Sequence, residues 1–173
     1  MSTVSPSLVR EIAQKAVTEK ALPVLDAPVS GCWMGAEAGT LSIMVGGPED
    51  TFKQYQFLLE AMGRSITYCG GTGMGLVAKL TNNTIEIVNM VGVFEGLALA
   101  LKAGVDKQVL FNIWKASTAE SWVIEHWDFF ERFFRDLNQL QMAKKDMGLA
   151  ADLAKQLGIS MPVTDLCSKL EQI

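Results

Sequence analysis

Two polar side chains near the middle of the chain have the types and the spacing needed to move a proton. Lys79 and Asn83 are four residues apart, so on a helix they share a face, and Asn82 and Glu86 extend this polar stripe. A lysine that loses solvation beside an amide can have its pKa lowered toward neutrality, and it can then exchange a proton with a substrate hydroxyl. A solvated stripe on an exposed helix end fits the same spacing, so the spacing alone leaves both interpretations open.

A second candidate site is the segment Ser30, Gly31 and Cys32, at the end of a predicted strand. A serine hydroxyl and a glycine N–H can together bind a carboxylate, and ligands bind at strand ends in open α/β sheets. A plain turn with local hydrogen bonds from the serine fits the same residues. A cysteine nucleophile is disfavoured, because the one histidine of the chain, His126, is 94 residues from Cys32.

Two further segments carry residues that could contact a ligand. The glycine-rich stretch at 69–75 leads into a predicted helix, and its N–H groups could bind a phosphate or carboxylate, or it could be a tight turn. In the predicted helix 136–157, Asp146 shares a face with Ala150 and points toward the packed side, whereas Lys145 points elsewhere. A buried ion pair or a helix cap is the alternative for Asp146.

The elements that must position these residues change in kind along the chain. Up to about residue 73 short strands alternate with helices, and beyond it the sequence predicts helices alone. The predicted elements are helix 7–19, strands 22–29 and 41–45, helix 48–62, strand 66–69, and helices 73–102, 106–117, 122–134, 136–157 and 163–172. A strand, a helix and a strand in that order predict parallel pairing. The fold class expected is mixed α/β followed by all-α.

Length and composition exclude several functional classes. The 173 residues suit one domain, or one domain plus part of another, and 49% apolar with 20% charged residues argues against disorder. The net charge of −4 disfavours nucleic acid as a partner. Three cysteines far apart fit neither a disulfide framework nor a zinc site, so we expect no metal and a cytoplasmic location. The apolar stretch 84–101 is interrupted by Glu86, Asn89 and Glu95, which predicts burial in protein rather than membrane.

Taken in order, four motifs resemble the β-hydroxyacid dehydrogenase family, the relatives of 3-hydroxyisobutyrate dehydrogenase and tartronate semialdehyde reductase. The motifs are Met-Ser-Thr-Val-Ser-Pro at 1–6, Asp-Ala-Pro-Val-Ser-Gly at 26–31 followed by a glycine-bounded strand at 39–47, Gly73-Met-Gly75 with Lys79, Asn82 and Asn83, and Lys145-Asp-Met-Gly-Leu-Ala150. The resemblance favours the functional interpretations of Lys79 and Ser30. It implies the C-terminal remainder of a Rossmann-type domain at 1–73, and a helical 6-phosphogluconate-dehydrogenase-like domain, built on one long helix, at 74–173.

The activity that the resemblance implies is the reversible oxidation of a small β-hydroxyacid to its semialdehyde, with hydride passing to NAD or NADP. Lys79 would be the general acid/base, and Asn83 would hold that lysine or the substrate. The substrate carboxylate would be bound at Ser30, Gly31 and Cys32, and the cofactor would be contacted by Thr3, Lys145 and Asp146. The long helix around residues 80–102, apolar nearly all round in its second half, would bring two subunits together as a homodimer.

The sequence departs from the family pattern at two places. Cys32, followed by Trp33, stands where the family usually has a second glycine, and this bulk is expected to change substrate choice. No Gly-x-Gly-x-x-Gly occurs in the chain, so we expect an N-terminally truncated chain that binds dinucleotide poorly and is inactive alone. Two alternatives stay open: a catalytically silent remnant that acts as a dimerisation module, and a dehydrogenase of the same fold with a different substrate.

Overall fold

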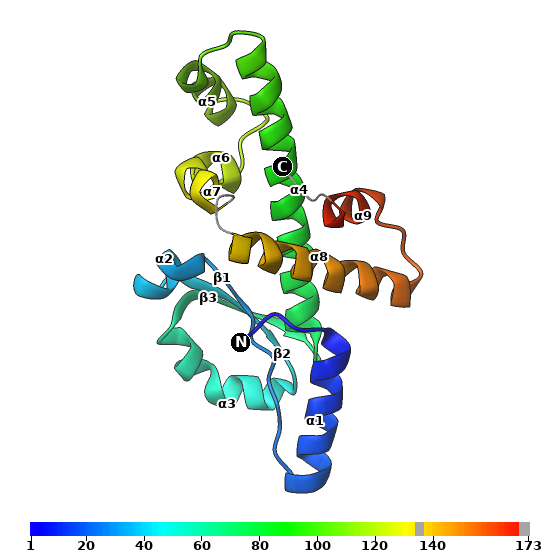
Figure 1. Ribbon diagram of the computed structural model, residues 1–173. Coiled ribbons are helices and arrows are strands. Elements are labelled where there is room, and N and C mark those ends of the chain that lie inside the picture. The colour runs from blue at the N-terminus through cyan, green and yellow to red at the C-terminus, as the bar shows by residue number, and fades with distance from the viewer. Residues whose placement is uncertain (134–136, 170–173) are drawn as a thin grey trace. The chain divides into compact units, whose positions relative to one another are not determined.

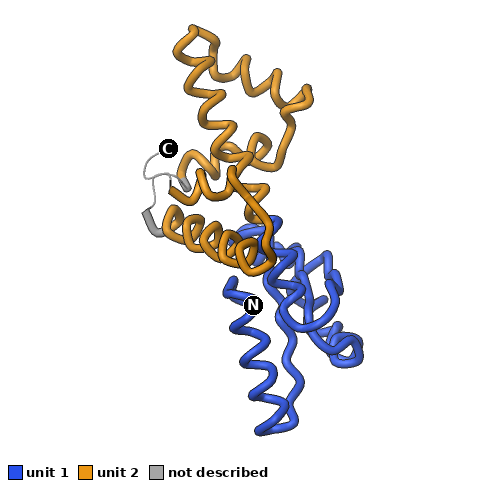
Figure 2. The backbone as a smooth tube through the Cα atoms, turned by 90° about the vertical axis from the view of Figure 1, so that its right-hand side faces the viewer, with its two compact units in different colours: residues 1–82 blue, residues 83–173 orange. Residues whose placement is uncertain are grey.

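The computed structural model describes residues 1–133 and 137–169, which form two compact units, residues 1–82 and 83–173 (Figure 2). The first unit has both strands and helices, and the described part of the second unit is helical. The predicted change from mixed α/β to all-α is therefore confirmed. The predicted helix ends at Phe134, Asp136 and residues 170–172 lie outside the described residues.

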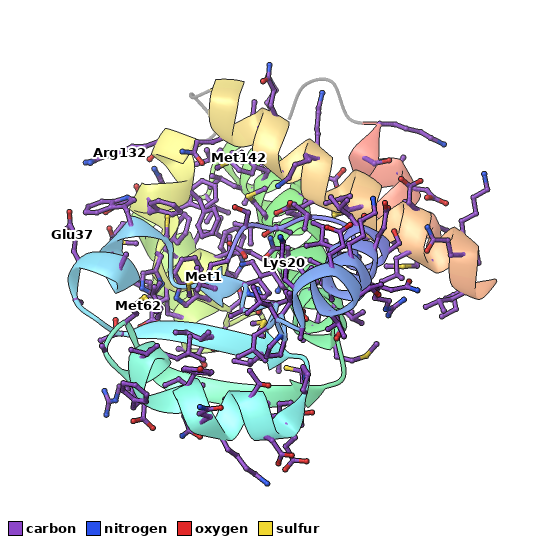
Figure 3. The ribbon with its side chains drawn as sticks, turned by 90° about the horizontal axis from the view of Figure 1, so that it is seen from below. Met1, Lys20, Glu37, Met62, Arg132 and Met142 are labelled. Atoms are coloured by element: carbon purple, nitrogen blue, oxygen red, sulfur yellow. The ribbon has the colours of Figure 1, made fainter. Side chains whose placement is uncertain are left out.

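Three helices and three strands precede the long helix in the first unit. They are α1 (Pro6–Lys20), β1 (Val29–Ser30), α2 (Cys32–Glu37), β2 (Leu41–Gly46), α3 (Glu49–Glu60) and β3 (Gly63–Gly70) (Figure 1). Helix α1 begins where the sequence predicts, because the Ser5 hydroxyl accepts a hydrogen bond from the Leu8 N–H at 3.2 Å and Pro6 follows it. Helix α2 was not predicted, and Glu37 projects outward from its exposed end (Figure 3).

The sheet of the first unit has the order β1-β2-β3. Strands β2 and β3 are parallel, with Ile43 opposite Ile66 and α3 as the crossover, so the predicted parallel pairing is confirmed. The strand predicted over 22–29 is wrong: only Val29–Ser30 pairs with β2, antiparallel, and Asp26 adds one isolated bridge to Gly46. Two prolines in the predicted stretch, at 23 and 28, have no N–H to donate to a neighbouring strand.

The core of the first unit lies between this sheet and α3. Ile43 and Val45, on alternate positions of β2, are completely buried, and Phe52 of α3 packs in the same cluster. The ring of Phe52 stacks on Tyr68 with centroids 5.2 Å apart, and the Tyr68 hydroxyl donates to the Gly47 carbonyl at 2.9 Å. Period-two burial on β2 thus fixes which face of the sheet α3 covers.

One uninterrupted helix, α4 (Met74–Lys102), runs for 29 residues from the first unit into the second, as the sequence predicts (Figure 1). It is the one helix of the described chain long and apolar enough to cross a membrane by length and composition. One such helix is weak evidence, because core helices of soluble proteins meet the same criteria. Charges at Lys79, Glu86 and Glu95 interrupt its apolar surface.

The rest of the second unit consists of helices that follow α4. They are α5 (Lys107–Lys115), α6 (Trp122–Glu125), α7 (Trp127–Phe133), α8 (Leu137–Leu157) and α9 (Pro162–Ser168). The single helix predicted over 122–134 is two helices, because α6 ends with His126 as its C-cap. Phe94 of α4 packs against Trp127 with ring centroids 4.8 Å apart, and Phe130 is buried in the same cluster. These aromatic residues form the core of the second unit.

The start of α4 approaches β2 so closely that Gly75 has no space for a side chain. A Cβ there would meet the Met44 carbonyl oxygen, and it would lie 3.0 Å from the carbonyl oxygen of Asp26. Backbone atoms cannot rotate away, so we expect Gly75→Ala to lower the free energy of unfolding by about 2 kcal/mol. Urea unfolding followed by circular dichroism measures this. The matched control is Gly71→Ala, whose Cβ meets nothing within 4 Å; equal stability of the two variants would contradict the packing described.

Candidate active site

Lys79 lies in the second turn of α4 and is 9% exposed. Its sequence neighbours on the buried side of the helix, Leu76 and Leu80, are each 1% exposed. Lys79 is therefore not a solvated side chain, whereas Asn82, Asn83 and Glu86 on the same stripe are half-buried. A lysine at a buried position has fewer side-chain conformations than an exposed one.

The N-terminus of α4 is occupied by a carboxylate of the chain itself. The Gly73 N–H donates to Asp26 Oδ1 at 2.6 Å, and the Leu76 N–H donates to Asp26 Oδ2 at 2.9 Å. The glycine-rich segment is therefore a tight turn whose N–H groups serve Asp26, and the phosphate-binding interpretation is not supported. Sequence reasoning missed Asp26 as a site residue. The available signal was Gly73, which precedes α4 and has no side chain to cap it.

The predicted carboxylate-binding segment lies at the end of β1. Ser30 is half-buried and pairs with Ser42 of β2. Gly31 has a φ of 122°, and its carbonyl accepts from the Gly35 N–H at 2.7 Å as α2 begins. Cys32 is exposed and has a φ of 56°, a left-handed conformation that favours glycine. This conformation gives a physical reason for the glycine that the family usually has there.

In the second unit, Asn83 of α4 and Asp146 of α8 are joined by a hydrogen bond. The Asn83 amide Nδ2 donates to Asp146 Oδ2 at 2.7 Å, and the Asp146 side chain is 12% exposed. The Lys145 ammonium lies 3.0 Å from Asp146 Oδ1 and forms an ion pair with it, without the geometry of a hydrogen bond. The Lys145 side chain is half-exposed. Asp146 thus points to the packed side and Lys145 away from it, as the sequence predicts. The structure brings together two motifs 63 residues apart.

The remaining predicted residues are placed as follows. Thr3 is half-buried in the first unit, two residues before the N-cap of α1. His126 stacks on Trp122 with ring centroids 4.3 Å apart, and its Nδ1 lies 3.0 Å from the Trp122 carbonyl oxygen, which suits packing rather than activation of a thiol.

Burial raises the pKa of the Cys69 and Cys167 thiols. Over the described residues no cluster of three or more His, Cys, Asp or Glu side chains could hold a metal ion.

Two family models match the chain one after the other. The NAD-binding domain model of 6-phosphogluconate dehydrogenase matches residues 1–71, and the NAD-binding model of NADP-dependent 3-hydroxyisobutyrate dehydrogenase matches residues 73–173. A Rossmann-type segment followed by a 6-phosphogluconate-dehydrogenase-like helical domain is therefore the fold, as predicted. A nicotinamide dinucleotide is the cofactor of this family, which confirms the predicted cofactor class.

Curated relatives and a solved structure agree with these models. Mitochondrial 3-hydroxyisobutyrate dehydrogenase from Drosophila melanogaster is 37% identical over 99% of this chain and 55% of its own length. An NAD-dependent L-serine dehydrogenase from Pseudomonas aeruginosa is 36% identical over 99% of this chain and 60% of its own length. The structure of 3-hydroxyisobutyrate dehydrogenase from Mycobacterium tuberculosis with L-serine has 32% identity and a TM-score of 0.80, covering 96% of this chain and 60% of that one.

The chain thus spans a little over half the length of the relatives it matches, and the matched region includes both compact units. The family models, the relatives and the fold agree with one another. The chain belongs to the β-hydroxyacid dehydrogenase family, as a relative of 3-hydroxyisobutyrate dehydrogenase.

Proposed function

We propose that this chain supplies the substrate-binding and proton-transfer part of a dehydrogenase that moves hydride between NAD or NADP and a small β-hydroxyacid. The observation that carries the proposal is the burial of Lys79 on α4, one helical turn before Asn83, whose amide is held by Asp146. The relatives named for 3-hydroxyisobutyrate and L-serine support this substrate class, since both compounds have a hydroxyl on the carbon β to a carboxylate.

Lys79 is the proposed general acid/base. Oxidation of an alcohol requires removal of the hydroxyl proton as hydride leaves the same carbon, and a neutral amine at the hydroxyl oxygen accepts that proton. In the reverse direction the ammonium returns the proton to the carbonyl oxygen. A bound nicotinamide supplies the hydride chemistry itself. The protein's part is to hold the amine in place and to keep it from bulk water, and the burial of Lys79 supports both tasks.

Asn83 is the proposed orienting residue. Its Nδ2 donates to Asp146, and this hydrogen bond determines the direction in which the amide oxygen faces. That oxygen can accept a hydrogen bond from Lys79 or from the substrate hydroxyl. Asp146 then acts through Asn83, and its ion pair with Lys145 partly neutralises the carboxylate.

Substrate and cofactor roles complete the proposal. Ser30 and Gly31 bind the substrate carboxylate, and Cys32 with the exposed Trp33 adjusts which side chain the substrate can have. Thr3 and Lys145 contact the cofactor on its nicotinamide side. We place the functional division after residue 73, supported by family models that meet at 71 and 73.

The described residues do not offer a place for the cofactor's pyrophosphate at the start of α4, because Asp26 fills that helix end. The chain also has no Gly-x-Gly-x-x-Gly. We therefore propose that these 173 residues alone bind dinucleotide weakly and have little dehydrogenase activity by themselves. A cytoplasmic location remains a proposal, supported by three free cysteines.

Replacement of Lys79 tests the proposed chemistry. In the protein as its native source produces it, Lys79→Ala should lower kcat with 3-hydroxyisobutyrate or L-serine by about 10²- to 10⁴-fold, because the proton acceptor is lost. Initial rates of NAD and NADP reduction measure this. Lys155→Ala, an exposed lysine on α8, is the matched control and should keep full activity. An active Lys79→Ala protein would refute the assignment, and a native protein that is inactive with every β-hydroxyacid would favour the silent dimerisation module.

Loss of the Asn83 amide should affect stability as well as rate. Asn83→Ala leaves the largely buried Asp146 Oδ2 without its donor, so the free energy of unfolding should fall by about 1–3 kcal/mol. Urea unfolding of this 173-residue chain measures the loss. Asn112→Ala, which removes an exposed amide bonded to Gln108 on α5, is the control and should change stability by less than about 0.5 kcal/mol. Equal effects of the two substitutions would mean that the Asn83–Asp146 contact contributes nothing.

We also propose that a second copy of the chain covers one side of α4 within residues 80–102. Ile85, Gly92 and Leu99 recur every seven residues and so form one stripe along the helix. All three are exposed, with Leu99 at 73%, whereas Met90 and Leu97 on the opposite side are buried in the core. An apolar stripe exposed along a long helix is typical of a subunit interface.

A charge on this stripe should separate the subunits. Leu99→Glu is expected to convert a dimer to a monomer, because an unpaired carboxylate would enter an apolar contact. Light scattering coupled to size-exclusion chromatography measures the mass. Leu157→Glu, at another exposed leucine that ends α8, is the control and should leave the dimer intact. A wild-type monomer, or a dimer unchanged by Leu99→Glu, would place any interface elsewhere. Phe94 lies on the same helix but is not used for this test, because its ring packs on Trp127 within the second unit.

A further inference from the structure

We propose that Asp26 is a positioning residue for Lys79: its carboxylate fixes the start of α4 on the sheet and thereby sets where the lysine lies relative to the Ser30–Gly31 segment. The inference rests on the proposed role of Lys79 as general acid/base. Asp26 belongs to the same motif as Ser30, yet its side chain is 5% exposed and is directed to the backbone of α4. It therefore acts through the helix rather than on a substrate.

The carboxylate of Asp26 replaces a missing helix cap. The first N–H groups of any α-helix have no partner within the helix, and Gly73, just before α4, has no side chain to supply one. Asp26 accepts from the N–H groups of Gly73 and Leu76, one to each carboxylate oxygen. Its negative charge also lies at the positive end of the helix dipole. The helix start is thus fixed by two charge-assisted hydrogen bonds from a residue 47 positions earlier in the chain.

The backbone of Asp26 is fixed just as firmly to the end of β2. Its N–H donates to the Gly46 carbonyl at 2.9 Å, and its carbonyl accepts from the Gly46 N–H at 2.8 Å. Two residues on, the Pro28 carbonyl accepts from the Met44 N–H at 3.0 Å, and Ser30 then pairs with Ser42. One short segment along β2 therefore carries both the anchor of α4 and the proposed carboxylate-binding serine.

Glycines on both sides make room for this anchor. A Cβ on Gly46 would lie 2.5 Å from Asp26 Oδ1 and 2.8 Å from the Gly75 nitrogen, and a Cβ on Gly75 would lie 2.9 Å from Asp26 Oδ2. Any side chain at either position would displace the carboxylate or the helix. The absence of side chains at 46 and 75 is thus a second, independent observation that the local structure is built around Asp26.

The distance from the anchor to the reacting group is short. Lys79 follows Leu76 by three residues, so it is about 4.5 Å further along the helix axis and on nearly the same side. A displacement of the helix start by about 1 Å therefore moves the lysine by a similar amount. Misplacement of a catalytic group by about 1 Å can lower a rate by about 10²-fold. Asp26 is expected to control the rate without contacting the substrate.

The test uses Asp26→Asn and Asp26→Ala in the natively produced protein, with Asp50→Asn as the matched control. Asp50 is also an acid in the first turn of a helix, but it is exposed on α3. Asp26→Ala should lower kcat by about 10- to 100-fold with little change in KM for the cofactor. Asp26→Asn, which keeps one acceptor oxygen, should recover part of that loss. Asp50→Asn should match the wild type.

Two readouts separate positioning from simple loss of fold. Amide hydrogen exchange should show lost protection at both Gly73 and Leu76 in Asp26→Ala and at one of the two in Asp26→Asn, with the β2 and β3 amides still protected. Far-UV circular dichroism of both Asp26 variants should match the wild type, because the helices and the β2–β3 pairing stay formed. An unchanged spectrum with lost protection at the start of α4 shows that the anchor was removed from a folded unit.

Each outcome supports or overturns the inference. Lost protection at the start of α4 together with a lower kcat supports it. Lost protection with an unchanged kcat overturns positioning, and unchanged protection overturns the anchor itself. If Asp26→Ala does not fold, the amide protection and the kcat of Asp26→Asn alone support or overturn the inference. Failure of the proposed function gives a different pattern, since Lys79→Ala would then be as active as wild type while the exchange result at Gly73 and Leu76 would stand.

Discussion

The buried carboxylate of Asp26 connects the end of β2 to the start of α4 in the first compact unit. Backbone hydrogen bonds fix it to the end of β2, and its two oxygens bind the start of α4. Because a helix start without a cap carries a positive partial charge and unpaired N–H groups, it needs such an acceptor from elsewhere in the chain. Gly46 and Gly75 then allow the strand and the helix to approach. The position of Lys79 follows from this arrangement.

Helix α4 contributes residues to both compact units. Its first turns carry Lys79 in the unit that also holds Ser30, and its later turns form the core of the second unit through Met90 and Leu97. Asn83, at the start of the second unit, is held by Asp146 of α8. Lys79 and Asn83 are four residues apart in this helix, so about one helical turn separates the proposed base from its proposed orienting amide along the chain.

The sequence predicts most of the fold because hydrophobic periodicity and glycine or proline boundaries decide it locally. The long helix, the two paired strands and the crossover helix between them all follow from such patterns, as does the inward face of Asp146. Asp26 itself could not be identified, because the uncapped Gly73 shows only that α4 needs an acceptor and not which residue, 47 positions earlier, supplies it. Likewise, the spacing of Lys79 and Asn83 fits a solvated stripe equally well, and only burial decides between the two.

The most direct test of the central claim is to follow the hydrogen that leaves the substrate. The natively produced protein would be incubated with 3-hydroxyisobutyrate or L-serine deuterated at the carbon that bears the hydroxyl, in the presence of NAD or NADP. Mass spectrometry of the reduced cofactor would then detect the label. If hydride passes from the substrate carbon to the cofactor, one deuterium is expected on the nicotinamide ring of each reduced cofactor. Oxidation of the substrate without label on the cofactor, or no turnover of any β-hydroxyacid, would contradict it.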